Sequence, residues 1–309
     1  MNTATMPIER LMSECDNIQY ASKTCCYTGC SNSPIISHTI SENYLYKLNK
    51  DLTKVLTFQP KIGQVAKKYN PQHVTKVDKK KFSTFVGFCE AHDNDLFSLL
   101  DNFNGKMNKE KAALVHYRNI CYGISHIKTQ KYRERHVAQQ NYMQQNGEID
   151  SESILPLLKN GALQVRLSYC LQEHLQRKRI LEKAIKSKDF ESIDFIEIEG
   201  GGNNPIFSGR SSYLMHPRNK LFDFPGYAFM PWVSYMTLLT HTSNHLVFCW
   251  LKSDKKHSRA LGNIIKNKEF KNTLAILAYG SSDSFAIEES VLASHAATIG
   301  KVIESFRVY

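Results

Sequence analysis

The sequence lacks the features that would place this protein in a membrane or in a secreted disulfide framework. Its longest apolar run, Leu246 to Leu251, is far shorter than the roughly 20 residues that cross a bilayer as a helix. The first 25 residues contain no positively charged start followed by an apolar run, which a secretory signal requires. Eight cysteines spread over 309 residues are too few for a disulfide framework. We therefore expect a soluble, cytoplasmic protein without a membrane partner.

Two common catalytic signatures are also missing. The glycine run 200–202 lacks the Lys-Ser/Thr ending of a P-loop and the spacing of a dinucleotide fingerprint, so we interpret it as a turn. No Gly-x-Ser-x-Gly elbow suggests a serine hydrolase. The remaining candidates for functional chemistry are the cysteines and the charged residues.

Positive charge is in excess, with a formal net charge of +11. Residues 50–81 carry nine lysines against two acids, Asp51 and Asp78. Such a density of charge attracts polyanions by neutralising phosphates and releasing counterions, which makes DNA or RNA the natural partner. The alternative is a solvated lysine-rich loop that only keeps the protein soluble.

Two short-range pairs of soft ligands lie near the N-terminus. The first pair is in the segment Cys26-Tyr27-Thr28-Gly29-Cys30, and the second is in Cys89-Glu90-Ala91-His92. Two local pairs joined across a loop are what a tetrahedral Zn²⁺ ion needs, and their ligand atoms should converge within about 4 Å of one another. We therefore predict a structural zinc site with the ligands Cys26, Cys30, Cys89 and His92.

Two substitutions within this ligand set remain open. Cys25 is the alternative to Cys26, because adjacent residues in a turn face different directions. His38 is the alternative to His92, or else it fixes the loop through hydrogen bonds from outside the ligand set. Only the three-dimensional arrangement decides between these possibilities.

The chain divides into three predicted parts of an α+β protein. Residues 1–104 hold the zinc unit, 105–190 a long helical hairpin, and 191–309 an α+β domain. Apolar residues at helical spacing predict a helix over 108–145, and a second helix runs from about 150 to about 188. The basic faces of this hairpin include Lys128 and Lys131 on the first helix and Arg179 and Lys183 on the second. Acidic residues lie between these cations, so the alternative is an ordinary salt-bridged surface.

Period-two patterns from residue 193 onward predict a C-terminal antiparallel sheet. Strands are expected over 193–199, 232–239 and 246–252, with the segment 240–245 as the turn of a hairpin. Helices over 257–268 and 287–307, with a short strand over 273–279, should cover one face of this sheet. This domain is a candidate surface for a protein partner.

The order of these N-terminal motifs resembles the treble-clef zinc fold of HNH-type endonucleases. More narrowly, Cys26-x-x-Gly29-Cys30, then Ile36–Ser41, then Ser83–Asn94 is similar to a group of uncharacterised bacterial proteins, over about the first hundred residues. The resemblance implies that His38 acts as a general base on a phosphodiester of DNA or RNA. It also implies that Asp93 or Asn94 binds a catalytic Mg²⁺ or Mn²⁺ ion or orients His38. A role in phage defence or in a mobile element would suit such a nuclease.

The sequence departs from the HNH pattern at two places. Ser37 precedes His38 where that pattern commonly has an acidic or histidine metal ligand. The final helix carries Asp93-Asn94-Asp95 where a further histidine or asparagine is usual, and an acid there also favours the positive end of a helix. The alternative function is therefore a non-catalytic module that zinc only folds and that binds protein or nucleic acid.

Overall fold

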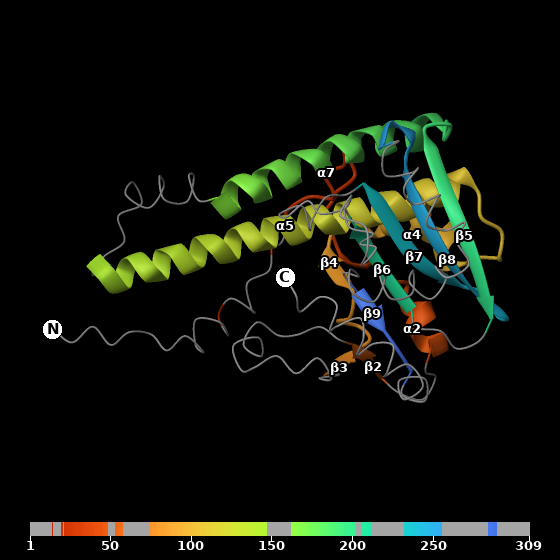
Figure 1. The fold of residues 1–309 in the computed structure, drawn as a ribbon, viewed down its shortest axis with the longest axis horizontal. Coiled ribbons are helices and arrows are strands. Elements are labelled where there is room, and N and C mark those ends of the chain that lie inside the picture. Colours follow the sequence, from red (N-terminus) through yellow and green to blue (C-terminus); the bar gives the residue numbers. More distant parts are fainter. Residues whose placement is uncertain are drawn as a thin grey trace, which may run out of the picture.

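The computed structural model describes residues 14, 20, 22–48, 53–57, 75–146, 162–201, 206–211, 232–254 and 284–288. Most of the lysine-rich stretch 50–81 lies outside these residues, as do the expected helix over 257–268, the strand over 273–279 and nearly all of the helix over 287–307. The described part is a mixed helix and sheet structure with antiparallel sheets, which confirms the α+β class (Figure 1).

The N-terminal elements are short. They are β1 (Ile36–His38), α2 (Glu42–Leu48), β2 (Lys54–Thr57), β3 (Thr75–Asp78), β4 (Thr84–Val86) and α4 (Glu90–Asp101). β1 pairs antiparallel with β4, and β2 pairs antiparallel with β3. Because β1 and β4 flank the intervening segment, their pairing brings residues before His38 next to the start of α4.

Two long helices follow and lie side by side (Figure 1). The expected helix over 108–145 is α5 (Lys109–Asn146), and the second expected helix is described as α7 (Ala162–Ser187). Tyr117 reaches Glu182 near the start of α5, and Lys131 reaches Ser168 further along, so the two helices run antiparallel. None of the described helices combines the length and the apolar character that a bilayer crossing requires.

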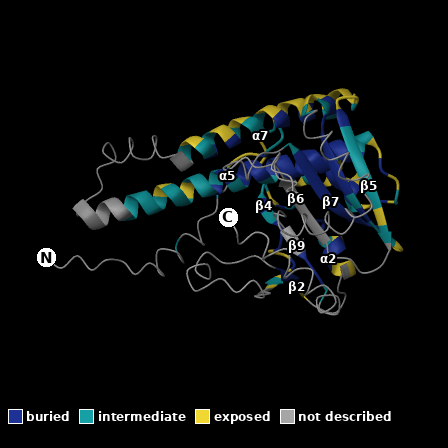
Figure 2. Cartoon of the chain, viewed as in Figure 1, coloured by how far each residue is buried: buried dark blue, intermediate teal, exposed yellow. Residues whose placement is uncertain are grey.

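A five-stranded antiparallel sheet packs against α5. Its order is β5-β8-β7-β6-β9, with β5 (Ile193–Gly201), β6 (Ile206–Ser211), β7 (Val233–Leu239), β8 (Ser243–Leu251) and β9 (Ser284–Ala286). A 3₁₀ turn, η2 (Lys252–Asp254), ends β8. Every residue of β7 is buried, and the part of α5 that lies on the sheet is buried as well (Figure 2). The sheet face is thus covered by the helix that precedes it in the chain.

One hydrophobic core connects the three expected parts. Its buried members run from Cys25 in the loop 25–30 through Phe97 on α4 and Ile120 on α5 to Val247 on β8 and Ala286 on β9. A continuous core means that the three parts support one another. The part boundaries at residues 104 and 190 remain predictions. In the described residues no separate core marks either boundary.

The turn between β7 and β8 is shorter than expected. Residues 243–245 were expected in the turn, yet β8 begins at Ser243, because Ser243 and His245 pair with Gly201 and Glu199 on β5. The His245 ring bridges two side chains, with Nε2 2.8 Å from the Ser243 Oγ and Nδ1 2.7 Å from the Glu197 carboxylate. This ring is therefore part of the buried hairpin and not an ordinary turn histidine.

Candidate metal centre

The loop that carries the first cysteines is fixed by backbone hydrogen bonds. The Cys25 N–H donates to the Asn32 carbonyl at 3.0 Å, and the Cys26 N–H donates to the Gly87 carbonyl at 2.8 Å, just before α4. The Cys30 N–H closes the loop on the Tyr27 carbonyl at 3.1 Å. Gly29 has φ +91°, a left-handed conformation that glycine adopts without a Cβ penalty. The sequence thus folds here into a tight turn that presses against the start of α4.

The second ligand pair lies at the N-terminus of α4. Cys89 is the N-cap of this helix, with extended backbone angles, and His92 follows in the first turn. Residues three apart in the first turn of a helix lie on the same side, so both side chains face the loop. The pairing of Ile36 with Val86 and of His38 with Thr84 holds this helix start in place.

Four side chains converge between the loop and α4. The ligand atoms of Cys25, Cys30, Cys89 and His92 all lie within 4.8 Å of one another. Sγ of Cys30 is 3.8 Å from Sγ of Cys89, and Nδ1 of His92 is 3.6 Å from Sγ of Cys25 and 3.2 Å from Sγ of Cys89. A tetrahedral ion with Zn–S bonds of about 2.3 Å separates two sulfurs by about 3.8 Å. The largest separation between two ligand atoms is wider than the expected 4 Å. The four side chains could hold a metal ion.

The structure brings Cys25 into this group in place of the predicted Cys26. The side chain of Cys26 turns the other way, toward Cys121 on α5, and this hydrogen bond is the largest cause that lowers the pKa of Cys26. The reason is local: successive residues of the turn face opposite sides, and only Cys25 faces α4. Cys30, Cys89 and His92 lie where the spacing predicted them.

The sulfurs and the imidazole have supporting contacts of their own. Sγ of Cys25 accepts the N–H groups of Cys89 at 3.2 Å and of Tyr27 at 3.4 Å. The His92 backbone N–H is the main cause that lowers the pKa of Cys89 to about 6, whereas burial raises the pKa of Cys25 to about 11. The Tyr27 ring stacks on the His92 ring at 4.2 Å and fixes its orientation. These contacts orient the ligands, and they favour the thiolate of Cys89, whereas burial favours the neutral thiol of Cys25.

The predicted catalytic residues are placed less favourably. His38 is the last residue of β1 and Asp93 lies in the first turn of α4, close enough for each to affect the pKa of the other. Burial lowers the pKa of His38 and raises the pKa of Asp93. Nε2 of His38 and Oδ1 of Asp93 are both buried without a hydrogen-bond partner, while Asn94 is exposed. The structure therefore brings His38 and Asp93 toward one another, but Asn94 is not part of this pair.

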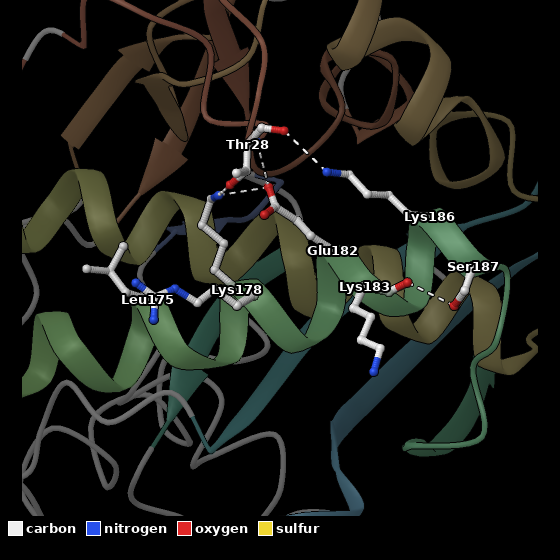
Figure 3. A pocket seen from close by; sticks show the side chains of 8 residues that line it. Thr28, Leu175, Lys178, Glu182, Lys183, Lys186 and Ser187 are labelled. Carbon is white, nitrogen blue, oxygen red and sulfur yellow. Dashed lines mark hydrogen bonds and ion pairs between the residues drawn. The ribbon is translucent and has the colours of Figure 1, made fainter.

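A polar cluster that the sequence did not reveal ties the loop 25–30 to α7. The buried Glu182 carboxylate accepts the Thr28 N–H at 2.9 Å and the Lys178 ammonium at 2.8 Å (Figure 3). It also accepts the Tyr117 hydroxyl at 2.7 Å. Lys178 also donates to the Thr28 hydroxyl at 2.8 Å. The i,i+4 spacing of Lys178 and Glu182 is the only signal in the sequence, and it is shared by many surface pairs.

Comparisons with known proteins supply no further constraint. No family model, no curated protein and no solved structure matches this chain. The function must therefore be argued from the residues and contacts described above.

Proposed function

We propose that Cys25, Cys30, Cys89 and His92 hold one structural Zn²⁺ ion. The proposal is carried by one observation, the convergence of three sulfurs and one imidazole nitrogen from two chain segments. Cys₃His is a common donor set of structural zinc sites, and four protein ligands leave no open position for substrate. The ion would join the loop 25–30 to the N-terminus of α4.

We further infer that the zinc unit is an HNH-like treble clef and that the protein is a metal-dependent endonuclease. The order of elements supports this: a cysteine loop, a strand that ends at His38, its antiparallel partner β4, and a helix whose N-terminus carries the second ligand pair. Burial lowers the pKa of His38, which keeps the imidazole neutral near physiological pH, as a general base must be.

The roles of the other predicted residues follow from this placement. Asp93, rather than the exposed Asn94, lies beside His38 to orient it or to help hold a Mg²⁺ or Mn²⁺ ion. The two unpartnered buried atoms, His38 Nε2 and Asp93 Oδ1, are of the kind that a bound ion or water satisfies. The substrate is DNA or RNA, and the net charge of +11 supports a polyanion. Phage defence is the proposed setting.

A specific observation favours the second candidate, a non-catalytic zinc module. Nε2 of His38 is buried, whereas a general base must reach the proton that it takes. Among the described residues, the Cys25 group is the only convergence of three or more ligand-type side chains, so no carboxylate site for a second ion is preformed there. In this candidate zinc folds the N-terminal unit, and the rest of the chain binds nucleic acid or protein.

One experiment on the purified protein tests both candidates. Zinc content is measured by plasma mass spectrometry for the wild type, Cys25→Ser and Cys26→Ser, and cleavage of single- and double-stranded DNA and RNA is assayed with Mg²⁺ or Mn²⁺. We expect one zinc per chain in the wild type and in Cys26→Ser, and its loss in Cys25→Ser. His38→Ala should abolish cleavage with zinc retained, while His241→Ala, which changes an exposed histidine in the β7–β8 turn, should cleave normally.

The outcomes separate the proposals cleanly. Zinc without cleavage of any substrate by the wild type supports the non-catalytic module and removes the nuclease. Cleavage that survives in His38→Ala removes His38 from the mechanism. A wild-type protein without zinc would overturn the metal site and both candidates that rest on it.

A further inference from the structure

The loop 25–30 and α7 line an open groove of ≈ 740 Å³. Thr28 contributes from the loop, and α7 contributes its second half (Figure 3). The charged residues along the groove are Lys178, Arg179, Glu182, Lys183 and Lys186. Four cations against one carboxylate make this a basic groove.

Part of this positive charge is neutralised within the protein. Lys178 and Glu182 are both buried and lie 2.8 Å apart, so they neutralise one another. Arg179, Lys183 and Lys186 are exposed. Three positive charges therefore remain available to a ligand.

These three cations differ in how firmly they are held. Lys186 donates to the Thr28 carbonyl at 3.3 Å and lies 5.0 Å from the centre of the Tyr27 ring, which holds it at the rim while its other two N–H donors stay available. Neither Arg179 nor Lys183 forms an ion pair with any other residue that the structure describes. The Lys183 ammonium group points away from the Thr28 cluster (Figure 3).

The spacing of the three cations matches a repeating anion. Positions 179, 183 and 186 follow the i, i+4, i+7 pattern, which places them on one face of α7. At 1.5 Å per residue they span roughly 10 Å along the helix axis. One strand of nucleic acid presents a phosphate about every 3.4 Å along its axis, so this span corresponds to about three nucleotides.

We propose that this groove binds the sugar-phosphate backbone of a nucleic acid strand. Arg179 supplies a planar fork for bidentate phosphate contact, Lys183 and Lys186 supply point charges, and the Thr28 hydroxyl is a further polar group at the loop edge. Contacts of this kind fix a strand without reading its sequence. The inference deepens the proposed function, because it names the surface that presents nucleic acid to the zinc unit.

Fluorescence anisotropy with labelled oligonucleotides of about 12 residues tests this groove, since this length exceeds its three-nucleotide span. The double variant Arg179→Gln/Lys183→Gln removes two exposed charges and should leave zinc content and circular dichroism unchanged. The matched control is Lys47→Gln/Lys106→Gln, which removes the same charge from two exposed lysines outside both the groove and the lysine-rich stretch 50–81. At about 0.1 M salt we expect at least a tenfold loss of affinity in the groove variant and less than a twofold loss in the control.

The salt dependence adds a second readout. Loss of two phosphate contacts should reduce the slope of log K against log salt by about 1.4 for a single strand. An equal loss of affinity in both variants, or a wild type that binds no nucleic acid, overturns the inference. Binding of polyglutamate or of phosphatidylserine vesicles, but not of oligonucleotides, would assign the groove to another anion. Because neither variant changes a zinc ligand or His38, zinc content and cleavage chemistry are judged separately.

Discussion

In the loop from Cys25 to Cys30 only Cys25 is buried, whereas in β7 every residue from Val233 to Leu239 is buried. The strand is held by apolar area removed from water on both faces of the sheet. The loop buries less of it: Cys25 belongs to the core, and Cys26, Tyr27 and Cys30 are only partly buried against it. Backbone hydrogen bonds, the Glu182 cluster and the converging ligands also hold the loop. Two parts of one core therefore depend on different forces and should respond to different perturbations.

Removal of the proposed zinc ion should have the largest effect and should be confined to the loop side. Structural zinc contributes an apparent ~10–16 kcal/mol in isolated zinc-finger peptides. The shared core with Phe97 and Leu100 of α4 offsets part of this loss here. After a strong chelator or in Cys89→Ala we therefore expect amide exchange in 25–32 and at the start of α4 to rise by about a thousandfold.

Hydrogen exchange measured by mass spectrometry gives the matching control inside the same molecule. Peptides from β7 and β8 should change by less than about tenfold, because their burial does not involve the ligands. Equal acceleration of both regions would contradict the division and show that the metal supports the entire fold.

The reverse perturbation is a truncation in the sheet. Leu238 on β7 has no exposed surface and lies in the main core. Leu238→Ala should lower the free energy of unfolding by about 2–5 kcal/mol, since it removes apolar contacts and leaves a cavity. Urea denaturation followed by the fluorescence of Trp232 and Trp250 measures this loss, and zinc content should remain at the wild-type value.

The matched control for this truncation is Leu99→Ala, because the Leu99 side chain is 42% exposed on α4. Its effect should be within about 0.5 kcal/mol of zero, as for most surface substitutions. A Leu238→Ala protein that loses its zinc along with its stability would show that the sheet and the metal site are not separable.

Acid should act on the contact between α5 and β7, with the smallest of the three effects. The His116 ring is completely buried, and its Nδ1 lies 2.7 Å from the Ser234 Oγ. Burial, with a smaller contribution from Arg177, lowers the pKa of His116 to about 3. The unfolded chain takes up this proton near pH 6.5 and the folded chain does not, so the stabilisation is complete above pH 6.5 and falls toward pH 3.

When the pH is lowered from 6.5 to 5.5, His116 alone should lower the free energy of unfolding by about 1 kcal/mol. Urea denaturation at both values, for the wild type and for His116→Gln, isolates it, because contributions from the metal ligands cancel in the difference. Identical pH slopes in the two proteins would show that His116 is not the responsible group.

The sequence predicted those features whose causes are local. The long unbroken helical pattern predicted α5 almost to the residue, and the alternation in 193–199 and 232–239 predicted β5 and β7. The spacing of Cys30, Cys89 and His92 predicted three of the four side chains that converge in the candidate metal centre. Each of these follows from the periodicity or turn geometry of one segment.

The features that the sequence missed depend on contacts between distant segments. Whether Cys25 or Cys26 faces α4 depends on how the turn sits against Gly87 and on the presence of Cys121 beneath it. The buried role of Glu182 depends on Thr28 and Tyr117, which are 154 and 65 residues away in the chain. The start of β8 at Ser243 depends on its pairing with β5. No window of the sequence contains both partners of these contacts.

The turn at Gly29 has one further consequence, which concerns chirality. A β-carbon built at this position would meet no atom within 4 Å, so the space around it is open. What excludes an L-amino acid is the handedness of the backbone, since φ +91° is disfavoured for L-residues by about 1–2 kcal/mol. A D-alanine adopts the same angle without strain. The loop is therefore a place where a mirror-image residue, introduced by chemical ligation of the N-terminal segment, would preorganise the cysteines before any metal arrives.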